Sequence, residues 1–157
     1  MTEGGSSIPE VHALLRALAA GRRAAEIGTA FGEGARAIAE TAESLVTVEL
    51  DAVRVEAARE TLAGLDNVTA VHGDWREVLP LLAPFELVLV DGGGQATKTD
   101  PGVLDLGARG TIFMLDDMTP GYPGPDPVRE LWLGSERLAA VELLTTPTTA
   151  AIVATLL

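Results

Sequence analysis

The chain has 157 residues, of which 47% are hydrophobic, it contains no cysteine, and its formal net charge is −12. This length fits one domain with one sizeable core, and no apolar run is long enough to cross a bilayer. A nucleic-acid binder needs a basic face that displaces counterions, whereas Arg22 and Arg23 are the only adjacent basic pair. We therefore expect neither nucleic acid nor a membrane as a partner.

The composition also bears on where the protein works. Because the chain has no cysteine, it has no disulfide and no thiolate chemistry. Its start, MTEGGSSIPE, lacks the basic and apolar regions of a signal peptide. We expect a cytoplasmic protein with a single domain over residues 1–157, in which residues 1–7 are frayed.

Short apolar runs alternate with amphipathic helices along most of the chain. Ser7-Ile8-Pro9-Glu10 predicts a helix start with a capping box and an early proline, and Gly21 predicts the end of that helix. Further helices are predicted after a glycine-rich turn, after a cap at Asp51, and at residues 75–82 and 103–107. Strands are predicted at residues 24–27, 45–50, 67–73, 85–92 and 110–117.

The end of the chain follows a different pattern. Residues 136–157 form two extended runs joined by a Thr/Pro turn, which predicts a β-hairpin. Strand and helix alternate five times before it, and this predicts a parallel sheet between two layers of helices. The expected fold is α/β: a Rossmann-like, mostly parallel seven-stranded sheet with helices on both faces and a C-terminal antiparallel β-hairpin.

The turn after the first predicted strand reads EIGTAFGEG. Gly28 follows the strand, and Gly32 and Gly34 precede the next helix, so the spacing is G-x-x-x-G-x-G and not the dinucleotide G-x-G-x-x-G. Glycine permits tight turns and a close approach to a ligand. Glu26 and Glu33 would repel a pyrophosphate, so the turn favours a cofactor with a cationic end. A plain strand-to-helix turn is the alternative.

Three more acids follow consecutive predicted strands. Glu49 ends the second strand about 20 residues past Gly28, where a carboxylate accepts hydrogen bonds from ribose hydroxyls in such folds. Asp74 follows the third strand, where it can accept from an adenine amino group while Trp75 packs near the ring, and Asp91 follows the fourth. Open α/β sheets bind ligands at this edge. Each acid could instead cap a helix or lie in solvent.

The motifs AAEIGTAFGEG, VTVELD, VHGDWREVLP, LVLVDG and GTIFMLDDMTPG resemble those of class I S-adenosylmethionine-dependent methyltransferases, from about Pro9 to Leu157. Within that class the resemblance is greatest to the catechol O-methyltransferase-like enzymes that methylate small molecules. It implies that Glu26 and Gly28 lie under the methionine part of the cofactor, that Glu49 holds the ribose and that Asp74 holds the adenine. The cofactor-binding residues predicted in full are Glu26, Gly28, Thr29, Gly32, Gly34, Glu49, Leu50, Gly73, Asp74, Trp75 and Asp91.

The acids after the fourth and fifth predicted strands suggest a metal site next to the cofactor. The alternative is that Asp117 caps a turn and Asp91 contacts the cofactor or the substrate. If the fourth and fifth strands are neighbours, Asp91, Asp116 and Asp117 converge, and carboxylate clusters suit Mg²⁺, Mn²⁺ or Ca²⁺. The resemblance maps the Asp, Asp and Asn ligands of related metal-dependent enzymes onto these residues, with Asp117 in place of Asn. The family's lysine is replaced by Gly94, and Lys98 lies four positions later. Asp91 and Lys98 are the predicted catalytic residues, although a solvated Lys98 is the alternative.

The acceptor site has to come from short segments, because the chain has no large insertion. The candidates are the N-terminal segment with His12, residues 92–101, and the proline-rich residues 119–127 with Tyr122. The C-terminal hairpin is a candidate homodimer surface. We expect a methyltransferase for a small hydroxylated molecule. The alternatives are a non-catalytic S-adenosylmethionine-binding protein and an oxidoreductase that uses nicotinamide adenine dinucleotide, NAD.

Overall fold

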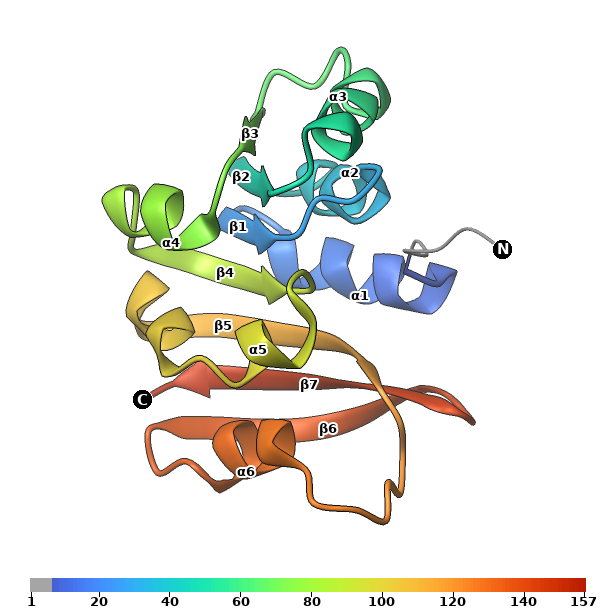
Figure 1. Ribbon diagram of the computed structural model, residues 1–157, viewed down its shortest axis with the longest axis vertical. Helices are drawn as coiled ribbons and strands as arrows, with labels where there is room; N and C mark the ends of the chain where they lie inside the picture. Colours follow the sequence, from blue (N-terminus) through green and yellow to red (C-terminus); the bar gives the residue numbers. More distant parts are fainter. Residues whose placement is uncertain (1–6) are drawn as a thin grey trace.

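A computed structural model describes residues 7–157, and Figure 1 shows them as one sheet between helices. The seven strands lie in the order β3-β2-β1-β4-β5-β7-β6. Strands β3, β2, β1, β4 and β5 are parallel, while β7 runs antiparallel to both β5 and β6. The predicted fold class, including the terminal hairpin, is confirmed. The strands are β1 (Arg23–Ile27), β2 (Ser44–Glu49), β3 (Val68–His72), β4 (Phe85–Val90), β5 (Gly107–Met118), β6 (Leu138–Thr146) and β7 (Thr149–Leu156).

Helices cover both faces of this sheet. Buried side chains of α1, α2 and α3 pack on one face, and buried side chains of α4 and α6 and of two 3₁₀ helices pack on the other. The helices are α1 (Pro9–Ala19), α2 (Glu33–Ala39), α3 (Ala52–Thr61), α4 (Trp75–Val78), α5 (Gly94–Lys98) and α6 (Pro127–Gly134), with the 3₁₀ helices η1 (Leu79–Leu81) and η2 (Pro101–Leu106). No helix within residues 7–157 is both long and apolar enough to span a membrane.

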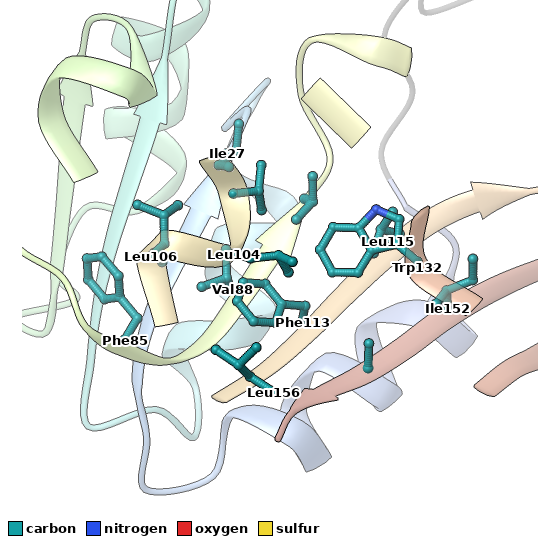
Figure 2. Close-up of a cluster of buried hydrophobic side chains, with 14 of the residues drawn as sticks. Ile27, Phe85, Val88, Leu104, Leu106, Phe113, Leu115, Trp132, Ile152 and Leu156 are labelled. Atoms are coloured by element: carbon teal, nitrogen blue, oxygen red, sulfur yellow. The ribbon is translucent and has the colours of Figure 1, made fainter. Parts of the chain in front are cut away.

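The larger core lies on the α6 side of the sheet (Figure 2). Phe113 of β5 and Trp132 of α6 are fully buried, and their ring centroids are 5.5 Å apart in a tilted arrangement. Such aromatic pairs stabilise a core beyond the area that they bury. This core fixes α6 and the end of β5 relative to each other, and the site described below depends on that end of β5.

Several local predictions can be compared with the structure. Asp51 caps α3 by accepting hydrogen bonds from the backbone N–H groups of Val53 and Arg54, as predicted. Pro9 is the first residue of α1, also as predicted, but Ile8 is the N-cap residue and no described side chain caps the helix, so the capping box is wrong. The Ser7 side chain hydrogen-bonds to Asp116 instead. The remaining residues predicted to be frayed, 1–6, lie outside the described residues.

Two helices were not predicted. Helix α5 lies in the segment expected to be a loop, because its glycines conceal it in the sequence. Helix α6 begins at Pro127, and Asp126 caps it by accepting from the N–H of Arg129. An aspartate followed by proline is a recognisable helix start, so the sequence did contain a signal for α6.

Candidate functional site

A cavity of about 340 Å³ opens at the carboxyl ends of the parallel strands. This volume lies within the range of small-molecule binding sites, and this edge is where open α/β sheets bind ligands. The cavity is lined by Ile27, Gly28, Ala30, Val48, Glu49, Leu50, Arg54, Gly73, Asp74, Trp75, Arg76, Asp91, Gly92, Gly93, Thr97 and Asp117.

Of the three glycines in the turn, only Gly28 belongs to the described lining of this cavity. Gly28 has φ +89°, and a Cβ built there would lie 2.3 Å from the Cα of Gly92. The N–H of Gly92 in turn donates to the carbonyl of Ile27 at 2.5 Å. The backbones after β1 and β4 are therefore in direct contact, which only glycine at both positions permits.

The two later glycines of the turn lie against protein and not against the cavity. A Cβ on Gly32 would meet the backbone of Ala58 in α3 at 3.2 Å, and one on Gly34 would lie 2.8 Å from Oε1 of Glu26. Gly32 and Gly34 were predicted to contact the cofactor. The described cavity lining includes neither of them, so their observed contacts are those of helix packing.

Glu26 and Thr29 lie beneath the turn, in the interior. Glu26 is 1% exposed, and its Oε2 accepts a hydrogen bond from Thr47 Oγ1 at 2.5 Å, while Thr29 and Thr47 share another at 2.6 Å. Burial raises the pKa of Glu26 to about 8. The hydrogen bond from Thr47 opposes this shift, and the charges of Asp91 and Glu49 add to it. Glu26 is thus a buried neutral acid at neutral pH that supports the turn from below.

Glu49 is held in a fixed orientation at the end of β2. Its Oε2 accepts from the N–H of Ala30 at 2.8 Å, and its Oε1 accepts from the N–H of Asp51 at 3.0 Å. A carboxylate can accept about four hydrogen bonds, so it keeps acceptor capacity for a ligand in the cavity that it lines. Leu50, the next residue, is 72% exposed on the same rim.

Asp74 and Trp75 line the cavity after β3. Asp74 caps α4 by accepting from the N–H of Arg76 at 2.9 Å, so the predicted helix-capping alternative is also satisfied. Trp75 is 7% exposed, and its Nε1 is buried with no hydrogen-bond partner among residues 7–157. An unpaired buried donor is costly unless water or a ligand accepts from it. Gly73 lines the cavity beside them.

Arg76 and Arg54 also line the cavity, and neither was predicted from the sequence. The Arg76 guanidinium lies 4.7 Å from the Trp75 ring centroid and pairs with Asp100 at 3.0 Å. That of Arg54 lies 6.0 Å from the Phe31 ring centroid. Each arginine lies in the first turn of a helix, two or three residues after the aspartate that caps that helix. This position next to the predicted acids could have identified both arginines in the sequence.

The acids at the ends of β4 and β5 lie close to one another. Burial raises the pKa of Asp91 to about 6, the charges of Asp117 and Asp116 raise it further, and the charge of Lys98 opposes the shift. Asp116 is 4% exposed and burial raises its pKa too, against hydrogen bonds from the backbone N–H of Asp117 and from Ser7. Asp91 and Asp117 line the cavity, whereas Asp116 lies behind its wall.

Asp117 has an unusual backbone. Its φ is +60°, and the register between β5 and β7 shifts between Leu115 and Met118. Such left-handed residues are uncommon and several-fold enriched in Asn and Asp. This irregularity leaves Asp116 buried and Asp117 exposed in one strand.

Lys98 does not lie in solvent. It is 8% exposed, and its Nζ donates to the backbone carbonyl of Asp116 at 2.6 Å. The alternative of a solvated Lys98 is therefore wrong. Lys98 is also absent from the described cavity lining, to which its neighbour Thr97 contributes. Its role as a catalytic residue stays a prediction that this position does not favour.

The described side chains do not form a metal site. Within residues 7–157, no group of three His, Cys, Asp or Glu side chains has the geometry to hold a metal ion. Asp91, Asp116 and Asp117 share an electrostatic environment, but Asp116 faces Ser7 and the backbone while Asp117 lies on the cavity rim. The residues present do not fit the predicted divalent metal.

The other candidate residues lie apart from the cavity. His12 lines a separate hollow between α1 and α2, and its Nε2 is buried without a partner among the described residues. His72 pairs its Nε2 with the carbonyl of Leu50 at 3.1 Å. Tyr122 is 55% exposed. The described cavity lining includes none of the three.

Comparisons with known proteins place this fold. No family model matches the chain, and no curated protein matches it by sequence. The structure is similar to the O-methyltransferase TomG of Streptomyces achromogenes, which is involved in tomaymycin synthesis and was solved with S-adenosylmethionine. The two are 26% identical, the match covers 99% of this chain and 83% of TomG, and the TM-score is 0.73.

Two further structures agree with this comparison. A putative O-methyltransferase from Klebsiella pneumoniae is 25% identical over 98% of this chain and 83% of its own, with a TM-score of 0.76. The O-methyltransferase of Bacillus cereus, solved with S-adenosylhomocysteine, is 20% identical over 99% and 84% of the two chains, with a TM-score of 0.78.

The fold is shared with S-adenosylmethionine-dependent methyltransferases, because two of the compared structures were solved with S-adenosylmethionine or S-adenosylhomocysteine. Within that class, the two compared structures with at least 25% identity are O-methyltransferases or putative ones. The predicted resemblance to the catechol O-methyltransferase-like enzymes is confirmed.

Proposed function

We propose that the protein transfers a methyl group from S-adenosylmethionine to a hydroxyl group of a small molecule. The observation that carries the proposal is the position of Glu49, Asp74 and Asp91 around one cavity that Gly28 also lines. These residues follow four different strands of a fold that is shared with O-methyltransferases.

Each part of the cofactor has a complementary group in this cavity. The fixed Glu49 carboxylate would accept from the ribose hydroxyls. Asp74 would accept from the adenine amino group, and the Trp75 ring would pack beside the base. The Gly28 backbone would lie under the methionine part, and the sulfonium cation suits a cavity with several carboxylates. When bound, the cofactor supplies the electrophilic methyl group.

Asp91 is positioned to act as the general base. A pKa of about 6 leaves Asp91 mostly ionised at neutral pH yet basic enough to take a proton, and efficient bases have a pKa near the working pH. The acceptor O–H bond gives its proton to the Asp91 carboxylate. A lone pair of the acceptor oxygen would then form the new bond to the methyl carbon. The bond between that carbon and sulfur would break, and the electron pair of the broken bond would stay on sulfur, which leaves neutral S-adenosylhomocysteine.

A binding experiment tests the cofactor assignment. Calorimetric titration with S-adenosylhomocysteine should give saturable binding to the wild type, and NAD should give none. Glu49→Gln should weaken S-adenosylhomocysteine binding by about tenfold, because it replaces the carboxylate that would accept charge-assisted hydrogen bonds from the ribose with a neutral amide. The matched control is Glu86→Gln, at an exposed residue of β4 whose carboxylate accepts from the N–H of Arg23. Tight NAD binding would overturn the proposal.

A non-catalytic S-adenosylmethionine-binding protein is the second candidate. It is favoured by the position of Lys98, which is buried behind the cavity and bonded to the Asp116 carbonyl. Transfer of a labelled methyl group to a panel of phenols and alcohols separates the two candidates. Turnover that Asp91→Asn removes, with cofactor affinity retained, supports an enzyme. Tight cofactor binding without transfer across the panel supports the binding protein.

The loops beside the cavity, the terminal hairpin and the net charge bear on the partners of the protein. The acceptor would enter beside residues 92–101 and 119–127, which adjoin the cavity wall at Asp91 and Asp117. A homodimer through the β6–β7 hairpin stays a prediction that agrees with the exposed side chains of Val141, Leu143 and Leu144. Sedimentation velocity tests it. The net charge of −12 argues against nucleic-acid partners, and the cytoplasmic location stays a prediction of the sequence.

A further inference from the structure

Lys98 is the only lysine in the chain, and the other ten basic residues are arginines. Lysine is normally among the most exposed residue types and is almost never fully buried unless it is paired. Here the single lysine is 8% exposed. A buried ammonium loses its hydration, so the protein has to provide partners for it.

The ammonium group and the backbone of Lys98 are both held by fixed partners. Nζ donates to the Asp116 carbonyl at 2.6 Å, and the backbone carbonyl of Lys98 accepts from Nε1 of Trp132 at 2.7 Å. Trp132 is fully buried against Phe113 in the larger core. The cation is therefore attached to the rigid core through α6 and to the end of β5 through its own side chain.

The Lys98 ammonium group lies near two acids and next to the backbone of a third. Its charge acts on both Asp91 and Asp116. The carbonyl that it binds belongs to the peptide group between Asp116 and Asp117, which immediately precedes the left-handed residue. An ammonium group at this carbonyl therefore both offsets the acids electrostatically and fixes the backbone that puts Asp117 on the cavity rim.

We propose that Lys98 is a positioning residue whose buried ammonium group takes the place of a divalent metal ion beside Asp91, Asp116 and Asp117. It compensates the charge of these acids from inside the protein and holds Asp117 at the acceptor end of the cavity. The inference uses the proposed function only to name that end, and its tests do not depend on turnover or on cofactor binding. The protein then needs no divalent ion to compensate the charge of these carboxylates.

Manganese binding tests the proposal, because Mn²⁺ is a paramagnetic probe with oxygen-ligand preferences close to those of Mg²⁺. Free Mn²⁺ is measured by electron paramagnetic resonance during titration of the wild type, Lys98→Met and Arg109→Met. Arg109→Met is the control, since it also removes one positive charge, and Arg109 is an exposed residue seven positions before Asp116 in β5. An extended strand separates two such residues by about 23 Å. We expect no saturable Mn²⁺ binding by the wild type or the control. Lys98→Met should bind Mn²⁺ saturably, with an affinity about tenfold or more above the weakest affinity that the titration detects for the wild type.

Saturable Mn²⁺ binding by the wild type with an affinity equal to that of Lys98→Met would overturn the proposal. An unchanged affinity in a folded Lys98→Met variant would also overturn it, because the removed charge would then not have been acting at the carboxylates. Circular dichroism establishes whether each variant is folded.

A measurement on the wild type decides the matter if Lys98→Met does not fold. Labelling with ¹⁵N-lysine gives one side-chain ammonium signal in nuclear magnetic resonance spectra, because the chain has one lysine. We expect this signal to be protected from exchange with water and to stay sharp when Mn²⁺ is added. Selective broadening by Mn²⁺ would place an ion among the three carboxylates and overturn the proposal, as would the fast exchange of a solvated lysine.

Discussion

The two halves of the cavity treat their carboxylates differently. At the ends of β2 and β3, Glu49 and Asp74 accept hydrogen bonds from backbone N–H groups close by. At the ends of β4 and β5, Asp91 and Asp116 face other acids and the buried Lys98, and burial raises the pKa of both. The first arrangement holds acceptors still for a ligand, whereas the second tunes proton affinity. We call the ends of β2 and β3 the recognition half of the cavity and the ends of β4 and β5 its acidic half.

The largest expected effect on stability and on cofactor binding comes from forcing apart the loops after β1 and β4, which touch at Gly28 and Gly92. Gly28→Ala would place a Cβ 2.3 Å from the Gly92 Cα at φ +89°, so the loops must move apart. We expect the free energy of unfolding to fall by about 3 kcal/mol or more, with loss of cofactor binding. Urea denaturation and calorimetry measure the two effects.

Gly64→Ala is the matched control for this change. Gly64 has φ +86°, and a Cβ there meets no atom of the described residues within 4 Å. Its cost should be about 1 kcal/mol, from the left-handed backbone alone. Equal destabilisation by both variants would show that the contact between the loops is unimportant.

The second effect concerns the acidic half alone. Asp91→Asn should lower kcat by about 10²–10⁴-fold, because it removes the proposed general base. In the wild type, kcat/KM should fall as the pH drops through about 6, where Asp91 becomes protonated. A profile that stays flat down to pH 5 would rule out Asp91 as the base.

Asp117→Asn refines the same measurement. Asn tolerates the left-handed backbone, so the change removes mainly a negative charge. The charge of Asp117 raises the pKa of Asp91, and its loss should therefore move the acid limb of the profile to lower pH. A shift to higher pH would contradict the electrostatic account of this half.

The third effect concerns the buried acid beneath the recognition half. The pKa of Glu26 rises from 4.5 to about 8 on folding, so this group favours the folded state fully below pH 4.5 and loses that contribution as the pH rises through about 8. Between pH 6 and 9 the wild type should lose on the order of 2 kcal/mol of stability from this group. Glu26→Gln keeps an acceptor for Thr47 and should not show this loss, as urea denaturation at both values would measure.

The smallest effect is expected at the edge of the recognition half. Arg76 pairs with Asp100 at 3.0 Å, but its side chain is 48% exposed. Exposed pairs contribute about 0–1 kcal/mol, so Arg76→Ala should change stability by less than about 1 kcal/mol and cofactor affinity by a few-fold. A loss of cofactor affinity as large as that of Glu49→Gln would give Arg76 a direct role in recognition.

The sequence predicted the strand ends and the helix cap around the recognition half because these features are local. Asp51 caps the next helix from a nearby position, and the end of each strand follows from its apolar run. The parallel sheet was predicted from the alternation of elements and the terminal hairpin from two extended runs joined by a turn, whereas the sequence left open whether β4 and β5 are neighbours, as the structure shows them to be.

The acidic half was harder to predict because its features depend on packing between distant segments. Lys98 is buried because Trp132, 34 positions later, bonds to its carbonyl and because the β5 backbone accepts from its Nζ. No spacing in the sequence encodes that pair of contacts. No spacing predicts the difference between Asp116 and Asp117 either. They are adjacent in sequence, but only Asp117 belongs to the described cavity lining.

The contact between Gly28 and Gly92 also limits how the protein can diverge. A side chain at either position requires the other loop to retreat, so substitutions there should arise only in compensating pairs. In residues 119–126, by contrast, a Cβ on Gly124 would first meet the exposed side chain of Tyr122, at 2.9 Å, and a side chain can move more easily than a backbone. If the proposed acceptor binds beside these residues, its identity can change through substitutions there while Gly28 and Gly92 stay the same.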